Sequence, residues 1–310
     1  MTKKILVFDG VNDHAVKELG EAGYQVVSNP QASDKDFSGD PDVVGFLLMT
    51  YPITGAIMDR YPNLKVIARH GVGYDNVDLE AAKERGIVVT NTPGANAIAV
   101  AETAVTLMLM AGRLFDTDKR GITDAKAKAY GAAHPGMQVS GKVVGILGFG
   151  HIGRTVAELL TGFGVKVLAY ARHDKDVPNG RMASLDEIFE QSDFVVSTLP
   201  ATPQTTKMIG ETAFKKMKQT AVLVNVGRGP VVDEAALIIA LKAGEIAAAG
   251  LDVVEKEPIS PDNELLSLEN TYVLPHIAGG SREAKQEIAE TAAQNILDVL
   301  AGKGSKDQVN

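Results

Sequence analysis

The sequence of 310 residues contains no cysteine. Disulfide bonds and thiolate metal sites are therefore excluded. No pair among the six histidines has the spacing of metal ligands, so no metal is expected. Cations are not in excess either, because the formal net charge at pH 7 is -8 and no basic cluster stands out. Nucleic acids and anionic membrane surfaces are therefore not expected as partners.

Neither a secretory segment nor a membrane span is expected from the sequence. Its first residues, Met-Thr-Lys-Lys, lead directly into a predicted strand rather than into an apolar stretch. A long apolar run at 97–111 contains Glu102 and is shorter than a membrane span. We interpret this run as a buried helix and expect a cytoplasmic protein.

Strand and helix patterns alternate along the chain, which is typical of parallel sheets flanked by helices. The length is sufficient for two domains, each with its own core. Strands are predicted in two sets, at 5–8, 25–28, 43–49, 65–68 and 87–90, and at 142–147, 165–170, 194–197, 221–225, 248–252 and 271–274. The predicted fold class is α/β with two doubly wound parallel-sheet domains, a flavodoxin-like substrate domain and a Rossmann nucleotide-binding domain.

The domain boundaries follow from the position of a glycine-rich loop after the strand at 142–147. A nucleotide-binding fold normally begins at its phosphate loop, so the residues far before the loop form a separate domain. The last predicted helix, 282–300, follows the final strand and is expected to return to the first domain. The predicted substrate domain is 1–96 plus 282–310, and the predicted dinucleotide-binding domain is 97–281. Only the tail, 302–310, is expected to be disordered.

The glycine-rich loop has the G-x-G-x-x-G pattern of a dinucleotide-binding turn. A strand precedes it, a helix follows, and a second strand comes where a ribose-reading residue should be. The first glycine permits the tight turn, the second lets the backbone approach a pyrophosphate, and the third lets the helix pack on the strand. The loop residues are Gly148, Phe149, Gly150, His151, Ile152 and Gly153.

The residue that would read the ribose is not acidic. Ala171, Arg172 and His173 stand at the end of the second strand. An Asp or Glu there would accept hydrogen bonds from the ribose hydroxyls and would repel a 2′-phosphate. A small residue followed by a guanidinium favours NADP over NAD. Two alternatives stay open: Arg172 and His173 as solvated loop residues, and Asp174 as the ribose acceptor.

Three polar residues follow successive predicted strands of the second sheet: Arg228, Glu257 and His276. Ligands of open α/β sheets bind at the carboxyl ends of strands. Reduction of a 2-oxo acid by a nicotinamide hydride requires a cation that holds the carboxylate and polarises the ketone, and an acid that protonates the alkoxide. Arg228 suits the first role and His276 the second. Glu257 is expected to accept a hydrogen bond from the other imidazole nitrogen. This bond fixes the tautomer and favours the protonated ring.

A lone histidine after a strand is more often a packing or capping residue than a catalyst. Together with the arginine, the glutamate and the nucleotide loop, the catalytic interpretation of His276 is favoured. At these residues the chain resembles the D-isomer-specific 2-hydroxyacid dehydrogenases over nearly its whole length. The resemblance runs from the segment VIARHGVGYDNVD at 66–78 through the glycine loop to Pro275 and His276.

The resemblance implies roles for individual residues. The catalytic Arg, Glu and His of the family fall on Arg228, Glu257 and His276. The Glu that matches is the one directly before Pro258, so Glu255 is expected to be a surface residue. The backbone around Val72 and Gly73 is implied to bind the substrate carboxylate, and Asp252 to contact the nicotinamide carboxamide. A homodimer formed through the nucleotide domain is also implied, and the Ala171-Arg172 pair resembles the NADP-using members.

The substrate is not determined by these residues. Arg69 and His70 precede the implied carboxylate-binding backbone. Two alternatives stay equal for these residues: contact with the substrate, and a salt bridge between the domains.

A small 2-oxo acid such as glyoxylate or hydroxypyruvate is favoured over 3-phosphoglycerate, because no amino-acid-sensing domain is recognised. A nucleotide-sensing binding module, as in corepressor relatives, is the alternative outside enzymes. Formate dehydrogenase fits poorly, since its acid-base position resembles a Gln-His pair.

Overall fold

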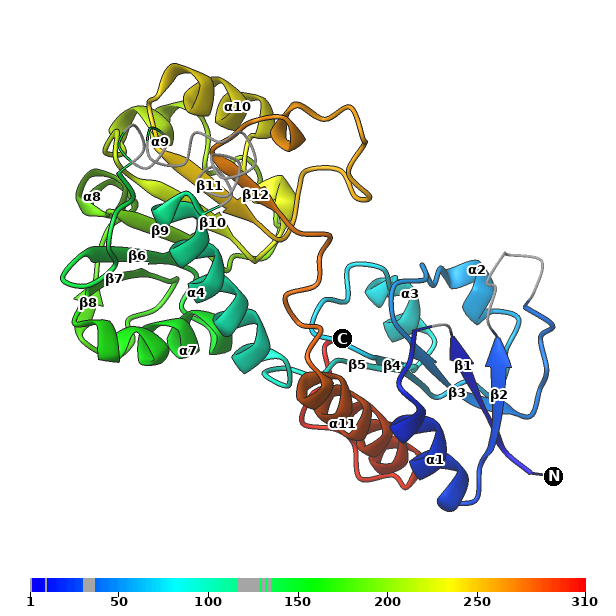
Figure 1. Cartoon of the computed structure of the whole chain (residues 1–310). Coiled ribbons are helices and arrows are strands. Elements are labelled where there is room, and N and C mark those ends of the chain that lie inside the picture. The colour runs from blue at the N-terminus through cyan, green and yellow to red at the C-terminus, as the bar shows by residue number, and fades with distance from the viewer. Residues whose placement is uncertain (1, 9, 30–36, 116–128, 130–131, 133–134) are drawn as a thin grey trace. The chain divides into compact units, whose positions relative to one another are not determined.

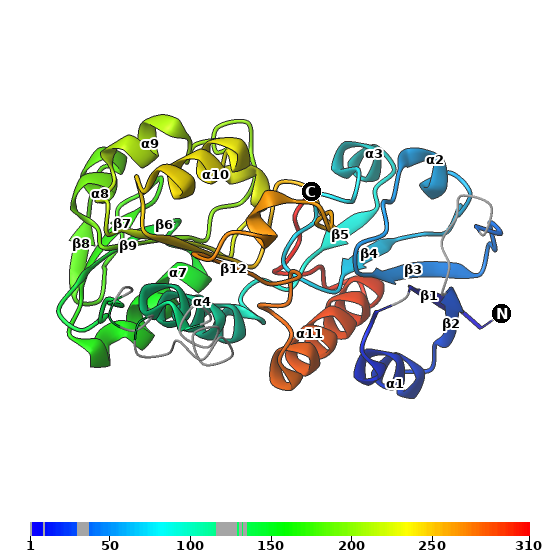
Figure 2. The same cartoon turned by 45° about the horizontal axis from the view of Figure 1, so that its top comes forward.

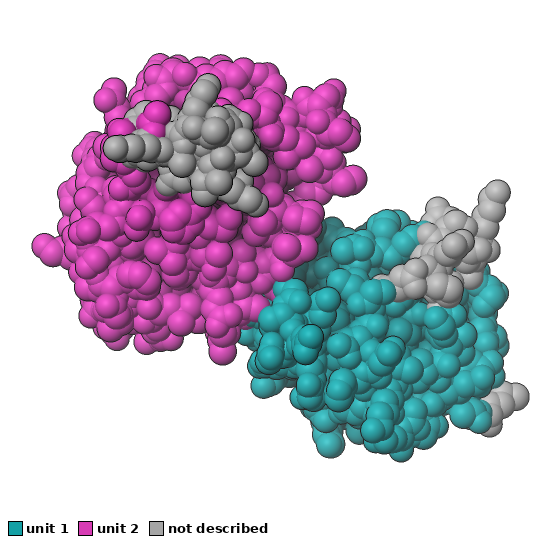
Figure 3. All heavy atoms as spheres, in the orientation of Figure 1, with its two compact units in different colours: residues 1–96, 280–310 teal, residues 97–279 magenta. Residues whose placement is uncertain are grey.

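The computed structural model describes residues 2–8, 10–29, 37–115, 129, 132 and 135–310. The chain divides into two compact units (Figure 3). Unit 1 contains Met1–Asn96 and Gly280–Asn310, and unit 2 contains Ala97–Gly279. Both chain termini therefore belong to unit 1.

Unit 1 is built on a five-stranded parallel sheet with the order β2-β1-β3-β4-β5 (Figure 1). This 2-1-3-4-5 order is the flavodoxin-like one. Helices α1 and α11 cover one face of the sheet, and α2 and α3 cover the other (Figure 2). The strands are β1 Lys4–Phe8, β2 Gln25–Asn29, β3 Val43–Leu48, β4 Val66–Arg69 and β5 Val88–Thr90. The helices are α1 Asp13–Glu21, α2 Gly55–Met58, α3 Leu79–Glu84 and α11 Arg282–Leu300.

Burial on both faces explains why the central strand of unit 1 is continuously apolar. All six residues of β3 are buried, as expected for a parallel strand with helices on either side. The long helix α11 begins at an N-cap, where the Ser281 side chain accepts from the Ala284 N–H. Its buried face carries the small residues Ala289, Ala292 and Ala293, which allow the helix to lie close to the sheet.

The prediction of a disordered tail at 302–310 is wrong. Gln308 forms an antiparallel bridge with Thr90, and the Val309 N–H donates to the Val89 carbonyl at 2.9 Å. The Asn310 side chain accepts from the Val89 N–H at 2.8 Å and donates to the Ile87 carbonyl at 2.7 Å. The tail thus lies along β5 and satisfies the hydrogen-bonding groups of this edge strand.

Unit 2 contains a seven-stranded parallel sheet with the order β12-β11-β10-β9-β6-β7-β8. Helices α4 and α7 lie on one face and α8, α9 and α10 on the other (Figure 2). The strands are β6 Val143–Leu147, β7 Lys166–Tyr170, β8 Gly180–Met182, β9 Phe194–Ser197, β10 Val222–Asn225, β11 Ala248–Leu251 and β12 Thr271–Val273. The helices are α4 Ala97–Arg113, α7 His151–Leu159, α8 Leu185–Gln191, α9 Glu211–Lys216 and α10 Glu234–Ala243.

The predicted fold class is confirmed, since both sheets are parallel and flanked by helices. The order of the second sheet reverses between β6 and β9, and such a switch point is where open α/β sheets bind nucleotides. The apolar run at 97–111 forms most of α4, whose buried residues include Ala104, Leu107 and Met108. Among the described residues, no helix has the length and apolar character to cross a membrane.

Candidate active site

The glycine loop of unit 2 joins β6 to α7 at the switch point. Gly148 has a φ of 90°, which a side chain would disfavour, and a Cβ on Gly153 would lie 2.2 Å from the Gly148 carbonyl oxygen. At Gly150, by contrast, a Cβ would meet nothing within 4 Å, so open space adjoins the backbone there. No side chain caps the N-terminus of α7, which begins at His151. Open space beside uncapped helical N–H groups is what a pyrophosphate requires.

The segment after β7 carries the residues predicted to read the ribose. Ala171 is half-buried, whereas Arg172, His173 and Asp174 are exposed. Lys175, which the sequence interpretation missed, donates from Nζ to the Phe149 carbonyl at 2.8 Å. This bond connects the segment after β7 directly to the glycine loop.

A second bond fixes the same segment from the helix side. Arg154 on α7 donates from Nη1 to the Asp176 carbonyl at 3.2 Å. The only signal in the sequence for either bond is a cationic residue near the loop, which does not specify a partner. The two bonds nevertheless connect the segment after β7 to the glycine loop and to α7.

Arg228 follows β10 in a turn that Asn225 organises. The Asn225 side chain accepts from the Gly227 N–H at 3.1 Å and donates to the Arg228 carbonyl at 3.0 Å. Arg228 is half-buried, and its Nη1 donates a hydrogen bond to the Gly227 carbonyl at 2.9 Å. Gly229 packs directly on the next loop, because a Cβ there would lie 1.7 Å from the Val254 carbonyl oxygen. Asn225, almost fully buried, was not identified from the sequence.

His276 and Glu257 lie together at the carboxyl edge of the sheet. The Nδ1 atom of His276 is 2.7 Å from Oε2 of Glu257. Glu255 points elsewhere: its N–H donates to Oε2 of Glu234 at 3.0 Å, and its carboxylate lies 3.6 Å from Lys207 Nζ. Of the two nearby glutamates, the one before Pro258 is therefore the histidine's partner.

Asp252 directly follows β11 and is buried. Its carboxylate accepts hydrogen bonds from backbone N–H groups just after His276. The structure thus brings Asp252, Glu257 and His276 into one connected cluster in unit 2.

Val72 and Gly73 belong to unit 1 and are half-buried. Arg69 donates from Nη1 to the His70 carbonyl at 2.7 Å and from Nε to the Asn76 side chain at 3.3 Å. His70 is buried, and its Nε2 accepts from the Asn12 N–H at 3.4 Å. Burial, reinforced by the nearby Arg69 charge, lowers the pKa of His70 to about 4. His70 is therefore neutral near pH 7.

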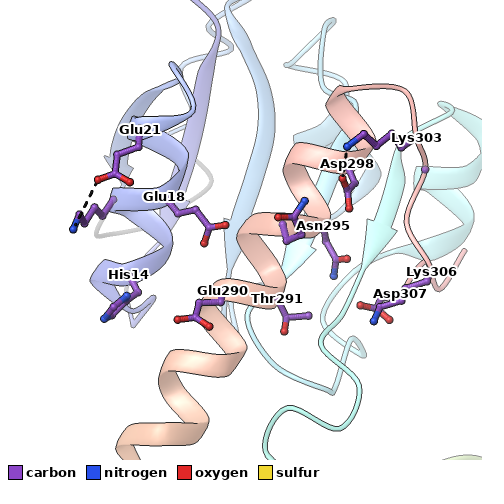
Figure 4. A pocket seen from close by; sticks show the side chains of 13 residues that line it. His14, Glu18, Glu21, Glu290, Thr291, Asn295, Asp298, Lys303, Lys306 and Asp307 are labelled. Atoms are coloured by element: carbon purple, nitrogen blue, oxygen red, sulfur yellow. Dashed lines mark hydrogen bonds and ion pairs between the residues drawn. The ribbon is translucent and has the colours of Figure 1, made fainter.

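A polar groove of about 830 Å³ lies between α1 and α11 in unit 1 (Figure 4). Glu18 and Glu290 face it from the two helices. Burial, with the charges of Glu290 and Glu21, raises the pKa of Glu18. None of the residues predicted for catalysis or cofactor binding lines this groove.

Comparison with known proteins identifies the family. Residues 105–278 match the family described as D-isomer specific 2-hydroxyacid dehydrogenase, NAD binding domain. A glyoxylate reductase of Korarchaeum cryptofilum is 42% identical over 271 residues, covering 85% of this chain and 81% of that protein. A glyoxylate/hydroxypyruvate reductase B of Salmonella newport is 36% identical over 320 residues, covering 100% of this chain and 98% of that protein.

A solved structure agrees with these sequence matches. The NADPH-dependent glyoxylate/hydroxypyruvate reductase of Sinorhizobium meliloti, crystallised with citrate, superposes with a TM-score of 0.89. It is 33% identical, and the match covers 99% of this chain and 97% of that one. The prediction of an NAD(P)-dependent oxidoreductase is confirmed, and the chain belongs to the D-isomer-specific 2-hydroxyacid dehydrogenase family.

Proposed function

We propose that the protein reduces a small 2-oxo acid, such as glyoxylate or hydroxypyruvate, to the D-2-hydroxy acid at the expense of NADPH. The observation that carries this proposal is the 2.7 Å pair of His276 and Glu257. The pair lies at the carboxyl edge of the same sheet that carries the glycine loop. Relatives named glyoxylate reductase and glyoxylate/hydroxypyruvate reductase support the substrate class.

His276 is the general acid of the proposed reaction. The bound cofactor supplies a hydride to the carbonyl carbon, and the oxygen must then receive a proton. Glu257 is bonded to Nδ1 of His276, so Nε2 is the atom that delivers this proton. The carboxylate holds the ring in one orientation and stabilises it while it is protonated.

Arg228 supplies the positive charge of the proposed site. Its planar guanidinium holds the carboxylate of the oxo acid and polarises the ketone. The two side-chain bonds of Asn225 hold the turn on which Arg228 stands. In unit 1, the backbone at Val72 and Gly73 binds the substrate carboxylate.

The cofactor assignment rests on the segment after β7. With Ala171 in place of an acidic residue, no charge at this position repels a 2′-phosphate. Arg172 is exposed, and its guanidinium can donate hydrogen bonds to that phosphate. NADP-bound and NADPH-dependent structures among the relatives support this preference. Unit 2 then corresponds to the dinucleotide-binding domain predicted at 97–281, and unit 1 to the substrate domain predicted at 1–96 with 282–310. The homodimer and the cytoplasmic location stay predictions from the sequence.

The proposal is tested with a panel of oxo acids assayed with NADPH and NADH. Glyoxylate and hydroxypyruvate should be reduced, and His276→Gln should lower turnover by at least about a hundredfold with cofactor affinity changed only a few-fold. A variant with full turnover would exclude His276 as the acid. Tight NADPH binding without oxidation by any oxo acid would favour the nucleotide-sensing module instead. Selective use of 3-phosphohydroxypyruvate would favour a phosphoglycerate dehydrogenase.

A further inference from the structure

The loop after β4 in unit 1 is held by its carbonyl oxygens. The Gly71 carbonyl accepts from the Thr92 N–H at 3.1 Å. The Val72 carbonyl accepts from Nδ2 of Asn91 at 2.7 Å. Both donors stand directly after β5, so two consecutive peptide groups of the loop are bound from the same side.

These bonds fix the direction of the N–H groups on the other side of the same peptides. A trans peptide is planar, and its C=O and N–H point in opposite directions. The bonded Gly71 carbonyl therefore directs the Val72 N–H away from β5, and the bonded Val72 carbonyl does the same for the Gly73 N–H. In the part of the chain that the structure describes, neither of these two N–H groups donates a hydrogen bond. They are available to a ligand.

The loop needs such a restraint because glycine follows the critical peptide and also precedes Val72. Gly71 has a φ of 147°, a conformation that side chains disfavour, and Gly73 has no side chain that would limit its φ. Without an external partner for the Val72 carbonyl, the Val72–Gly73 peptide can rotate at little cost. A rotated peptide would present a carbonyl oxygen to an anion instead of an N–H.

Asn91 is itself fixed by the last helix and the tail. It is buried, its N–H donates to the Asp307 carbonyl at 3.2 Å, and its carbonyl accepts from Nδ2 of Asn295 at 3.0 Å. The Asn295 side chain accepts in turn from Ser305 Oγ at 2.8 Å. Figure 4 shows Asn295 on α11 and Asp307 in the tail on neighbouring segments.

We propose that Asn91 is a positioning residue that aims the Gly73 N–H at the substrate carboxylate, and that α11 and the C-terminal tail hold Asn91 in place. This inference rests on the proposed function, in which the backbone at Val72 and Gly73 binds the carboxylate. It adds a side chain that acts through the loop backbone rather than on the substrate, and a tail, 302–310, whose residues Ser305 and Asp307 bond to Asn295 and Asn91.

The direct test is Asn91→Asp, which keeps the size of the side chain and removes the donor. The KM for glyoxylate should rise about tenfold, because one hydrogen bond to a charged group loses its alignment. The KM for NADPH should stay within about twofold, since the cofactor loop is in unit 2. Asn63→Asp is the matched control: Asn63 is an exposed residue of unit 1 whose Nδ2 donates to the Pro41 carbonyl at 2.9 Å.

Ser305→Ala tests the second half of the proposal and covers the case in which Asn91→Asp fails to fold. It removes the bond to Asn295 and the bond that the Ser305 hydroxyl accepts from the Asp307 N–H at 3.0 Å, and it leaves the residues of the loop unchanged. The KM for glyoxylate should rise by about two- to fivefold with unchanged KM for NADPH. A purely structural role would lower the unfolding temperature without separating the two KM values, and that result would overturn the proposal.

Oxalate binding separates this inference from the proposed function. Calorimetry with the parent and variant proteins in the presence of NADPH measures carboxylate recognition without turnover. If the parent reduces no oxo acid but binds oxalate, the proposed function fails, and about tenfold weaker binding by Asn91→Asp still supports the positioning role. If the parent turns over glyoxylate and Asn91→Asp has the parent's KM, only the positioning role is wrong. A parent that neither reduces oxo acids nor binds oxalate overturns both.

Discussion

Both carboxylate oxygens of Asp252 accept the backbone N–H of Ala278, at 3.1 and 3.0 Å. Oδ1 also accepts the Ile277 N–H at 2.8 Å, and the Asp252 carbonyl accepts the His276 N–H at 2.9 Å. His276 has a φ of 53°, which is uncommon for a residue with a side chain. One buried carboxylate and its own carbonyl therefore hold the strained turn that carries the proposed acid.

Asp252→Asn should lower turnover by at least about tenfold, because a side-chain amide accepts with only one oxygen and the His276 turn loses its restraint. Loss of charge-assisted bonds to a buried group should also cost about 1–3 kcal/mol of unfolding free energy. Steady-state kinetics and thermal unfolding measure the two effects. A raised KM for NADPH with unchanged turnover would instead support contact with the nicotinamide carboxamide, the role implied by the family.

Glu257→Gln should lower the turnover of oxo-acid reduction by at least about tenfold. The carboxylate oxygen 2.7 Å from Nδ1 of His276 holds the ring in one orientation and leaves Nε2 to deliver the proton. A neutral amide cannot support the positively charged ring in the same way. The matched control is Glu255→Gln, since Glu255 bonds to Glu234 and Lys207 and not to the histidine. Equal turnover for the two variants would exclude Glu257 as the partner.

Arg228→Lys should raise the KM for the oxo acid and lower turnover together. A guanidinium holds a carboxylate through two parallel donors, whereas an ammonium is a point charge. The combined loss in kcat/KM should be at least about tenfold, the equivalent of one charged hydrogen bond. Arg181→Lys, on the exposed edge strand β8, provides the control. Parental kinetics for Arg228→Lys would show that the fork geometry is unimportant.

His70→Gln should reduce the acid sensitivity of folding. Burial lowers the pKa of His70 from 6.5 to about 4, so between these values the unfolded chain binds a proton that the folded chain does not. Stability therefore rises with pH through this window and falls by up to about 3 kcal/mol as pH drops across it. Thermal unfolding at about pH 5 and pH 7 should show a smaller difference for His70→Gln than for the parent. His14→Gln, at an exposed site on α1, should behave as the parent does.

Predictability from the sequence followed the strength of local patterns. The central strands and α11 have long apolar or periodic signals, and their positions agree closely with the prediction. Strand β8 was missed because it has three residues, two of them exposed, and pairs only with β7. The tail was misjudged because its composition is polar. Its bonds to Ile87 and Val89 join residues more than two hundred positions apart, which no local pattern encodes.

The same distinction applies to the site. Arg228, Glu257 and His276 stand in short segments whose residue types indicate chemistry directly. Asn91 and Lys175 act through single bonds to backbone carbonyls, and these bonds depend on how the loops fold. Such positioning residues carry no chemical signature of their own, so they became visible only in the structure.

The choice between NADPH and NADH provides the prediction that is independent of the unknown oxo acid. NADPH should be preferred, because Ala171 lacks the charge that repels a 2′-phosphate and Arg172 is exposed beside it. Arg172→Ala should weaken NADPH binding about ten- to a hundredfold, the effect of one charged hydrogen bond, with much less effect on NADH. Ala171→Asp should weaken NADPH by like-charge repulsion and strengthen NADH by supplying a ribose acceptor.

Affinities for both cofactors, measured by fluorescence titration without any oxo acid, give the NADPH to NADH ratio for each variant. Arg181→Ala is the control for Arg172→Ala, since Arg181 is an exposed cation of unit 2 that pairs with Glu187. Its ratio should equal that of the parent. If the parent binds both cofactors equally and Arg172→Ala leaves the ratio unchanged, another residue reads the ribose. Asp174, exposed two positions beyond Arg172, is then the residue to replace, because its carboxylate is suited to accept from both ribose hydroxyls of NADH.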